Sequence, residues 1–238
     1  MSIRDTESFR SEVLNAFVVI PAYNEATVIR NVVAPLCGVF KNVVVINDGS
    51  SDETAEVLKG LPIYVISHSL NVGQGAAIQT GITFALKQGA QYIVTFDADG
   101  QHRIEDAIAA LREVASGCCG AACGSRFLDP QSIQRIPKFR RIVLKLAVIF
   151  QNLTSGTRLT DAHNGLRAFN RGAAACINIT QDGMAHASQI TTQLSEHKIV
   201  VREVPVQIDY TEYSLSKGQS SLNAINIVID LFLGRFMK

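Results

Sequence analysis

The 238-residue sequence predicts a single α/β domain, in which helices cover both faces of a mostly parallel sheet. Three observations lead to this fold class. The chain is 47% hydrophobic and only 18% charged, which suits one well-filled domain. Short apolar runs alternate with helix-like segments through the first half, and this alternation is typical of parallel sheets. A polar or glycine-rich turn follows each of these runs.

The first half of the chain contains four expected strands and three polar clusters. The apolar runs predict strands at residues 17–20, 43–46, 63–66 and 92–96. The polar clusters follow three of these strands: PAYNE at 21–25, NDGSSD at 47–52 and DADGQH at 97–102. Ligands of open α/β sheets bind at the carboxyl ends of the strands. We therefore expect one site built from three loops.

The second half predicts an elaborated continuation of the same domain. It contains GSRF (124–127), a long basic segment, DAHNGLRAFNR (161–171), a helix at 184–196, a strand pair near 199–210 and a terminal helix from about 221. Neither a low-complexity linker nor a repeat of fixed period separates the halves. We expect residues 1–238 to form one domain, with halves at about 1–120 and 121–220 and a C-terminal helix at 221–238.

The pair of aspartates in DADGQH is the strongest indication of a metal site. Side chains alternate along a strand, so Asp97 and Asp99 point the same way if the strand continues through them. Two converging carboxylates favour a hard divalent cation between them, and Gln101 offers a third oxygen. Such a cation would neutralise a departing diphosphate. The alternative is an ordinary Asp-Gly turn after a strand.

PAYNE and NDGSSD offer groups for a nucleoside. Pro21 fixes the backbone after the first strand, Tyr23 presents a flat face for a base, and Glu25 begins a helix whose N-terminus favours anions. The alternative makes Asn24 a simple helix N-cap. Asp48 either reads a base edge or forms only a turn and cap before the next helix.

Two glycines, Gly73 and Gly75, precede a predicted helix in NVGQGAAIQTG. They would allow the backbone to approach a phosphate, or they serve only helix packing. The segment lacks the GxGxxG spacing and the Gly-Lys-Ser/Thr ending of a P-loop, so a dinucleotide or ATP site is disfavoured.

A local basic patch is concealed by the overall net charge of +1. Residues 126–145 contain six basic residues and one acidic residue, Asp129. The basic residues are Arg126, Arg135, Lys138, Arg140, Arg141 and Lys145. Apolar residues at helical spacing lie between them: Ile136, Phe139, Ile142, Val143, Leu146 and Ile149. This pattern favours an interfacial helix on anionic lipid, and the alternative is a solvated charged face over the core. Nucleic acid is disfavoured because no aromatic stacking platform accompanies the charge.

The chain is expected to be cytoplasmic and peripheral at the inner face of the membrane. No segment reaches the roughly 20 apolar residues of a spanning helix, and the N-terminus lacks a secretory h-region. The five cysteines are expected to be buried, reduced thiols. The five histidines are expected to have supporting or surface roles, and His102 alone lies beside the proposed metal.

The ordered motifs PAYNE, NDGSSD, NVGQGAA, DADGQH, GSRF and DAHNGLRAF together resemble the family 2 glycosyltransferases of the GT-A fold. Within that family the resemblance is to the polyprenyl-phosphate sugar transferases, and it runs from Phe17 to about Ser221. It implies inverting transfer of a hexose from a UDP- or GDP-sugar, with Mg²⁺ or Mn²⁺, to a polyprenyl phosphate or another lipid-linked acceptor. The first half would then bind the nucleotide sugar and the second half the acceptor.

The resemblance also assigns residues. Pro21, Tyr23, Glu25, Asp48, Gly75, Asp97 and Lys217 would bind the donor, and Asp97, Asp99 and Gln101 the metal. Arg126 and Arg140 would grip a lipid phosphate, and Asp161 would be a candidate base near the sugar. Three departures from the family pattern weaken parts of this assignment: Gly100 where relatives often have Leu, Gln189 where an acid is expected, and an altered loop around Lys217.

Several alternatives stay open at this point. If the acceptor is a saccharide hydroxyl, Asp161 is needed as a base, whereas a lipid phosphate is already ionised and depends more on Arg126 and Arg140. A sugar nucleotidyltransferase or a non-catalytic nucleotide-sugar binder is a less favoured reading. A homo-oligomer or a membrane-protein partner is compatible with the sequence.

Overall fold

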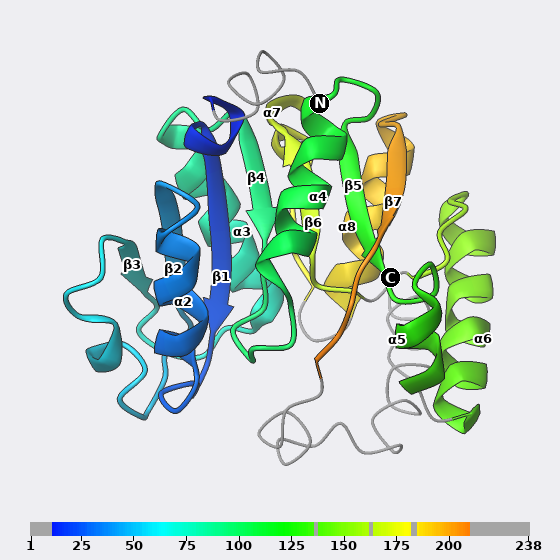
Figure 1. Cartoon of the computed structure of the whole chain (residues 1–238). Helices are drawn as coiled ribbons and strands as arrows, with labels where there is room; N and C mark the ends of the chain where they lie inside the picture. The colour runs from blue at the N-terminus through cyan, green and yellow to red at the C-terminus, as the bar shows by residue number, and fades with distance from the viewer. Residues whose placement is uncertain (1–10, 136–137, 162–163, 182–184, 210–238) are drawn as a thin grey trace.

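The computed structural model describes residues 11–135, 138–161, 164–181 and 185–209. Their strands form one sheet in the order β3-β2-β1-β4-β6-β5-β7 (Figure 1). All neighbouring strands are parallel except β6, which runs antiparallel to both β4 and β5. The strands are β1 (Ala16–Ala22), β2 (Asn42–Asn47), β3 (Tyr64–Ser67), β4 (Tyr92–Thr95), β5 (Ala121–Ser125), β6 (Arg167–Asn170) and β7 (Val201–Pro205). The predicted α/β fold class, with a mostly parallel sheet, is confirmed.

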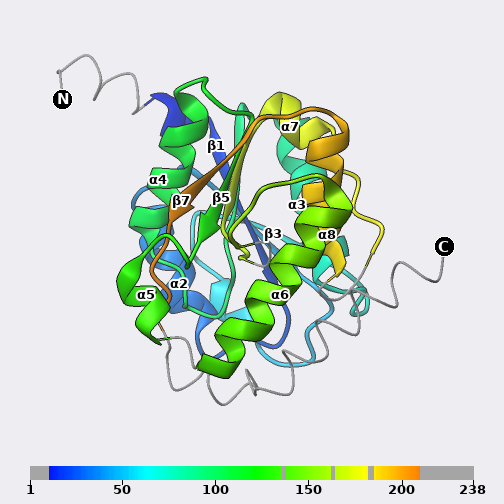
Figure 2. The same ribbon diagram turned by 90° about the vertical axis from the view of Figure 1, so that its right-hand side faces the viewer.

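Helices cover both faces of the sheet (Figure 2). One face is covered by α2 and α4, the other by α3, α7 and α8. The helices α5 and α6 follow β5 and lie beyond the β7 side of the sheet. The helical elements are α2 (Ile29–Cys37), η1 (Glu56–Leu58), α3 (Gln74–Lys87), α4 (Ile104–Ala115), α5 (Pro130–Arg135), α6 (Lys138–Ser155), α7 (Arg171–Ala175) and α8 (Ala185–Glu196).

The central strand β1 shows why the sheet is buried on both faces. Val18 and Ile20 belong to the core under α2 and α4, whereas Phe17 and Val19 belong to the core under α3. Side chains alternate along a strand, so a continuous apolar run fills both cores. The helix α3 lies very close to β1, because a Cβ at Gly81 would lie 2.2 Å from Cγ1 of Val19.

The predicted strand pair near residues 199–210 is wrong. A single strand, β7, occurs there and joins β5 in parallel. After Pro205 the chain is held by individual contacts instead of a ladder: Val206 N donates to Ser125 O, and Asp209 N donates to Gln101 O. The ion pair between Arg103 and Asp209 also anchors it to the start of α4. Tyr210 and the predicted helix at 221–238 lie outside the described residues.

The helix α6 exposes an apolar face. Leu144, Ala147 and Val148 are buried toward the protein. The side chains of Ile142, Leu146, Ile149 and Leu153, which we call the α6 stripe, are 55–81% exposed. Lys145 on the same helix is also exposed, so the choice between an interfacial helix and a solvated charged face stays a prediction. Ile136 lies outside the described residues, as do the side chains of Phe139 and Val143.

Two further sequence expectations can be compared with the structure. All five cysteines have free thiols, as expected, but the expectation that all are buried is wrong, because Cys118 is exposed and Cys37 and Cys176 are half-buried. Among the helices that the structure describes, none has both the length and the hydrophobicity needed to span a bilayer.

Candidate active site

The loops after β1 and β2 are joined by hydrogen bonds at the carboxyl edge of the sheet. Asn24, which adopts a positive φ of 54°, donates its backbone N–H to Ser50 Oγ at 3.0 Å, and its side-chain oxygen accepts from Ser51 N at 2.9 Å. Glu25 N donates to Thr54 Oγ1 at 2.8 Å. The two polar clusters therefore form one surface, as the three-loop prediction requires.

The local structure of PAYNE differs from the sequence expectation. Pro21 lies inside β1, paired in register with Ile46, and does not follow the strand. Glu25 lies before α2, which begins at Ile29 without a side-chain cap. The proposals that Glu25 begins the helix and that Asn24 caps it are both wrong, because Asn24 binds the β2 loop instead. The side chain of Tyr23 is 45% exposed, and its stacking on a base stays a prediction.

Asp48 organises the loop that precedes α3. Its carboxylate accepts from Val72 N at 3.1 Å and from Gly73 N at 2.8 Å, and His68 Nδ1 lies 2.7 Å from Oδ1. The side chain is almost fully buried. Asp48 therefore ties the end of β2 to the start of α3, instead of capping a helix after its own loop. Its contact with a nucleobase stays a prediction.

Gly75 is explained by packing. A Cβ at this position would lie 2.4 Å from the backbone oxygen of Gln181 and 2.9 Å from Cβ of His186. The first turn of α3 is thus in contact with the segment that leads to α8. This observation favours the packing alternative for Gly75, and approach to a phosphate stays a prediction.

The two aspartates of DADGQH lie beyond the end of β4, Asp97 just before a turn and Asp99 within it. The strand β4 ends at Thr95, and residues 98–99 form a turn that Gly100 completes with a φ of +76°. The condition under which strand alternation would point both carboxylates the same way, a strand that continues through them, is therefore not met. A glycine suits position 100 because a left-handed φ strains other residues.

Asp97 is surrounded by donors. His102 Nε2 lies 2.9 Å from Oδ2, and Gln74 Nε2 donates to Oδ1 at 3.2 Å. Burial alone would raise the pKa of Asp97, but the hydrogen bond and charge of His102, with the charges of Arg167 and His186, lower it overall. The carboxylate lies against Gly165, where a Cβ would be 2.1 Å from Oδ2.

Asp99 has the opposite electrostatic environment. Burial and the charge of Asp97 raise its pKa to about 6, although its carboxylate accepts a hydrogen bond from Gln101 N at 3.0 Å. A carboxylate that is disfavoured in its charged form fits the immediate neighbourhood of a cation. Within the described residues, no three His, Cys, Asp or Glu side chains are arranged to hold a metal. The raised pKa of Asp99 is the observation that fits a cation beside this carboxylate, and the identity of the metal ligands stays a prediction.

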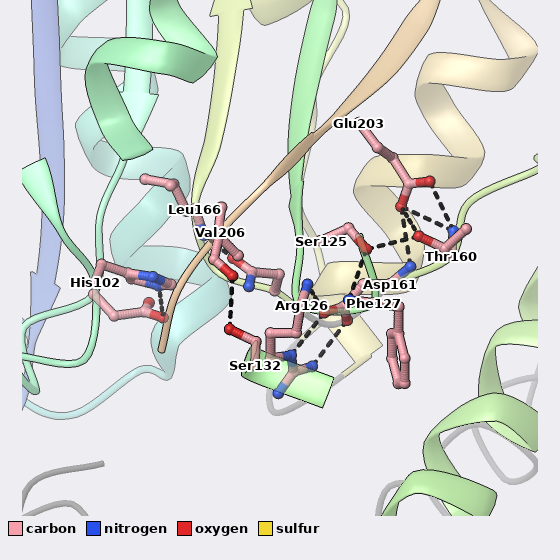
Figure 3. A network of polar contacts seen from close by, with 12 residues as sticks. His102, Ser125, Arg126, Phe127, Ser132, Thr160, Asp161, Leu166, Glu203 and Val206 are labelled. Atoms are coloured by element: carbon pink, nitrogen blue, oxygen red, sulfur yellow. Dashed lines mark hydrogen bonds and ion pairs between the residues drawn. The ribbon is translucent and has the colours of Figure 1, made fainter. Parts of the chain in front are cut away.

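Arg126 and Asp161 form a buried ion pair (Figure 3). Arg126 Nε donates to Oδ2 at 2.6 Å and its terminal nitrogen donates to Oδ1 at 2.8 Å, while Arg126 N also donates to Oδ2 at 3.2 Å. The side chains are 12% and 1% exposed. The structure thus brings together two predicted site residues 35 positions apart. Arg140 lies in the first turn of α6, but its side chain lies outside what the structure describes, and Lys217 lies outside it entirely.

Sequence reasoning missed one buried cation of the site. Arg167, the first residue of β6, is 2% exposed, and its charge lowers the pKa of Asp97. An arginine that opens an otherwise apolar strand was the available signal. Gln189, where an acid was expected, has a structural role because its side-chain oxygen accepts from Thr180 N and Gln181 N.

The chain is similar in sequence to several known proteins. The chain is 36% identical over 220 residues to an uncharacterized protein of Methanocaldococcus jannaschii, which covers 91% of this chain and 90% of that protein. It is 29% identical to the UDP-N-acetylglucosamine–dolichyl-phosphate N-acetylglucosaminyltransferase of Methanococcus voltae, covering 93% and 96%. It is 28% identical to the polyprenol monophosphomannose synthase of Mycolicibacterium smegmatis, covering 86% and 81%.

Solved structures support the same fold. Glucosyl-3-phosphoglycerate synthase from Mycobacterium tuberculosis, in complex with Mn²⁺, UDP and glucosyl-3-phosphoglycerate, superimposes with a TM-score of 0.69 at 15% identity, covering 97% of this chain and 83% of that one. The fold is therefore the GT-A fold that the sequence predicted. The family model described as glycosyl transferase family 2 matches residues 17–177. Because that match covers most of the chain and includes every motif from PAYNE to DAHNGLRAF, the protein belongs to glycosyl transferase family 2 and is a glycosyltransferase.

Proposed function

We propose that the protein transfers a hexose, with inversion, from a nucleoside diphosphate sugar to a polyprenyl phosphate. The names of two relatives support the acceptor, since one acts on dolichyl phosphate and the other makes polyprenol monophosphomannose. Family membership gives no support to a sugar nucleotidyltransferase or to a non-catalytic binder. UDP and GDP are both retained as donor nucleotides.

The hydrogen bonding of the Asp161 carboxylate is the observation that best distinguishes a phosphate acceptor from a hydroxyl acceptor. Both oxygens of its carboxylate accept from Arg126, so the carboxylate is engaged by a guanidinium and poorly suited to take a proton from a hydroxyl. A phosphate acceptor is already ionised and needs no base. The buried pair therefore favours a lipid phosphate over a saccharide hydroxyl, with Asp161 orienting Arg126.

The proposed reaction is a single displacement at the anomeric carbon. An oxygen of the acceptor phosphate forms the new bond to that carbon while the bond to the donor diphosphate oxygen breaks, and the electron pair leaves with the nucleoside diphosphate. The protein contributes mainly positioning and charge stabilisation. Arg126 would bind the acceptor phosphate, and Tyr23 and Glu25 would bind the nucleoside.

A divalent cation fits this scheme at Asp99. When bound, Mg²⁺ or Mn²⁺ would neutralise the charge that develops on the departing diphosphate. Asp99 and Gln101 are the residues that would hold it. Asp97 would then orient the donor, because His102 and Gln74 already hold its carboxylate.

The acceptor can be tested with a pair of lipids that differ only in the phosphate. The protein is incubated with UDP- and GDP-sugars, Mn²⁺ and either a short polyprenyl phosphate or the matching polyprenol, and products are identified by mass spectrometry. We expect a hexosyl phosphate lipid from the phosphate alone. Transfer to the polyprenol or to a free saccharide in preference to the phosphate would contradict the proposed acceptor.

We also propose that the α6 stripe lies against an anionic membrane surface. The stripe exposes four large aliphatic side chains, with the exposed cation Lys145 on the same helix. Arg126 does not belong to this surface, because its charge is paired with Asp161. An amphipathic helix with basic residues binds anionic interfaces through apolar burial and charge together. This location would bring the enzyme to a lipid acceptor.

Membrane contact can be measured by flotation with vesicles. Leu146→Asp with Leu153→Asp is expected to lower binding to phosphatidylglycerol vesicles by at least about tenfold, because apolar burial is lost and two repelled charges are added. Leu70→Asp with Val200→Asp adds the same charge at exposed aliphatic positions outside α6 and serves as the control. Equal flotation of the two double variants would be inconsistent with a membrane role of the stripe.

A further inference from the structure

The carboxylate of Glu203, in the middle of β7, gathers donors from the loop that precedes β6. Its Oε1 accepts from Thr160 N at 2.8 Å, from Thr160 Oγ1 at 3.0 Å and from Asp161 N at 3.0 Å. Its Oε2 accepts from Thr160 N at 2.9 Å. Two consecutive backbone amides thus converge on one carboxylate, which is a strong, charge-assisted arrangement.

The same loop is fixed from a second side by the end of β5. Ser125 Oγ lies 2.6 Å from Thr160 Oγ1 and accepts from Phe127 N at 3.2 Å. Glu203, Thr160 and Ser125 therefore join three segments that are far apart in the sequence (Figure 3). The position of residues 160–161 is determined by β5 and β7 together.

The next contact leads to the acceptor site. The backbone N–H of Asp161 donates to Glu203, which fixes the position of that residue. The Asp161 carboxylate accepts three hydrogen bonds from Arg126. Arg126 directly follows β5, so both ends of the ion pair depend on the same network. A shift of residues 160–161 would rotate the guanidinium away from its present direction.

Partial burial disfavours the charged form of the Glu203 carboxylate in this network. Burial raises its pKa, and the hydrogen bonds from Thr160 and Asp161 only partly oppose that effect. The neighbouring Arg202 differs, because it extends to Glu113 of α4 and its side chain is 53% exposed. Two adjacent residues of β7 can therefore be compared: Glu203, which is half-buried and bound to the loop before β6, and Arg202, which is exposed and bound to α4.

We infer that Glu203 is a positioning residue for the acceptor phosphate, acting through Thr160 and Asp161 on Arg126. This inference rests on the proposed function, since it assigns the acceptor phosphate to Arg126. Glu203 itself touches neither substrate. Its loss should therefore weaken use of the acceptor and leave donor binding unchanged.

The test compares Glu203→Ala, Glu203→Gln and Arg202→Ala in steady-state transfer. Glu203→Ala is expected to raise the acceptor KM about tenfold or more, with donor affinity within about twofold of wild type. Glu203→Gln keeps one acceptor oxygen and should recover most of that loss. Arg202→Ala should resemble wild type. An unchanged acceptor KM in Glu203→Ala, or a rise in both donor and acceptor KM together, would overturn the inference.

Hydrogen exchange separates a failure of this inference from a failure of the proposed function. Glu203→Ala should speed exchange at Thr160 and Asp161 about tenfold or more, while residues 97–103 exchange as in wild type. If wild type transfers nothing to polyprenyl phosphate, the proposed function fails. Faster exchange in Glu203→Ala would in that case still support positioning of Arg126, and unchanged exchange would refute it.

Discussion

Replacing Asp99 with asparagine is expected to remove metal-dependent donor binding and at the same time to stabilise the metal-free protein at neutral pH. The first effect follows because Asp99 is the carboxylate best suited to hold the cation. We expect the affinity for a nucleoside diphosphate sugar in Mn²⁺ to fall by roughly 100-fold or more. Asparagine keeps the side-chain oxygen that accepts from Gln101 N.

The second effect follows from the raised pKa of Asp99. In the folded, metal-free protein the pKa is raised from 3.8 to about 6, chiefly by burial and then by the charge of Asp97. The folded state therefore holds this proton more tightly than the unfolded state, and stability is lost as the pH rises from about 4 to about 6. Asparagine cannot ionise, so it should recover roughly 3 kcal/mol at pH 7.

Urea denaturation and titration calorimetry check both effects of the Asp99 substitution. The stability difference between Asp99→Asn and wild type should be present at pH 7 and should disappear below about pH 4. Asp106→Asn provides a matched control, since Asp106 is another carboxyl with a pKa raised by burial and it contacts Gln207 N instead of the turn. Undiminished Mn²⁺-dependent donor binding in Asp99→Asn would remove Asp99 from the metal site.

Separating Arg126 from Asp161 is expected to give the largest loss of stability and of acceptor use. Removing one member of a buried ion pair leaves the other charge without compensation, at a cost of about 3–5 kcal/mol. Asp161→Asn should thus be destabilised, with a raised acceptor KM and a kcat within about threefold of wild type. Arg126→Met should lower kcat/KM for polyprenyl phosphate by roughly 100-fold or more.

The double variant Arg126→Met with Asp161→Leu distinguishes folding from function. Replacing a buried pair by apolar side chains is often close to neutral, so the double variant should recover most of the stability lost in the single variants. It should still fail to use polyprenyl phosphate, while hydrolysis of the donor by water continues. A large fall of kcat in Asp161→Asn with no change of acceptor KM would instead indicate that Asp161 acts as a base.

The strands and the edge that carries the site could be predicted because they depend on local sequence. Runs of β-branched and aromatic residues such as 43–46 and 92–96 form strands, and the polar clusters after them mark the carboxyl ends. The parallel order of the first strands places those clusters together. The candidate metal and donor residues were proposed from these clusters, and their roles stay predictions.

The errors concern features that depend on partners distant in sequence. The sequence around Thr95 does not show that β4 ends there. Phe96, the next residue, is apolar and still donates its backbone N–H to Val19 O of the neighbouring strand β1. The extended segment after Pro205 looks like a strand but is held by Ser125, Gln101 and Arg103. The pairing of Arg126 with Asp161 is likewise a tertiary contact, so two residues predicted to act separately turn out to be bound to each other.

The direction of β6 has a consequence for how enzymes of this design can diversify. Because β6 is antiparallel to its neighbours, Arg167, which begins it, lies level with Thr95, which ends β4. The chain therefore departs from this edge after Ser125 and returns to the same edge at Arg167. The helices α5 and α6 therefore form an insertion between β5 and β6, and the two ends of this insertion lie close together at one edge of the sheet. Evolution or design could lengthen, shorten or exchange this insert to change the acceptor while the strands and the donor loops keep their register.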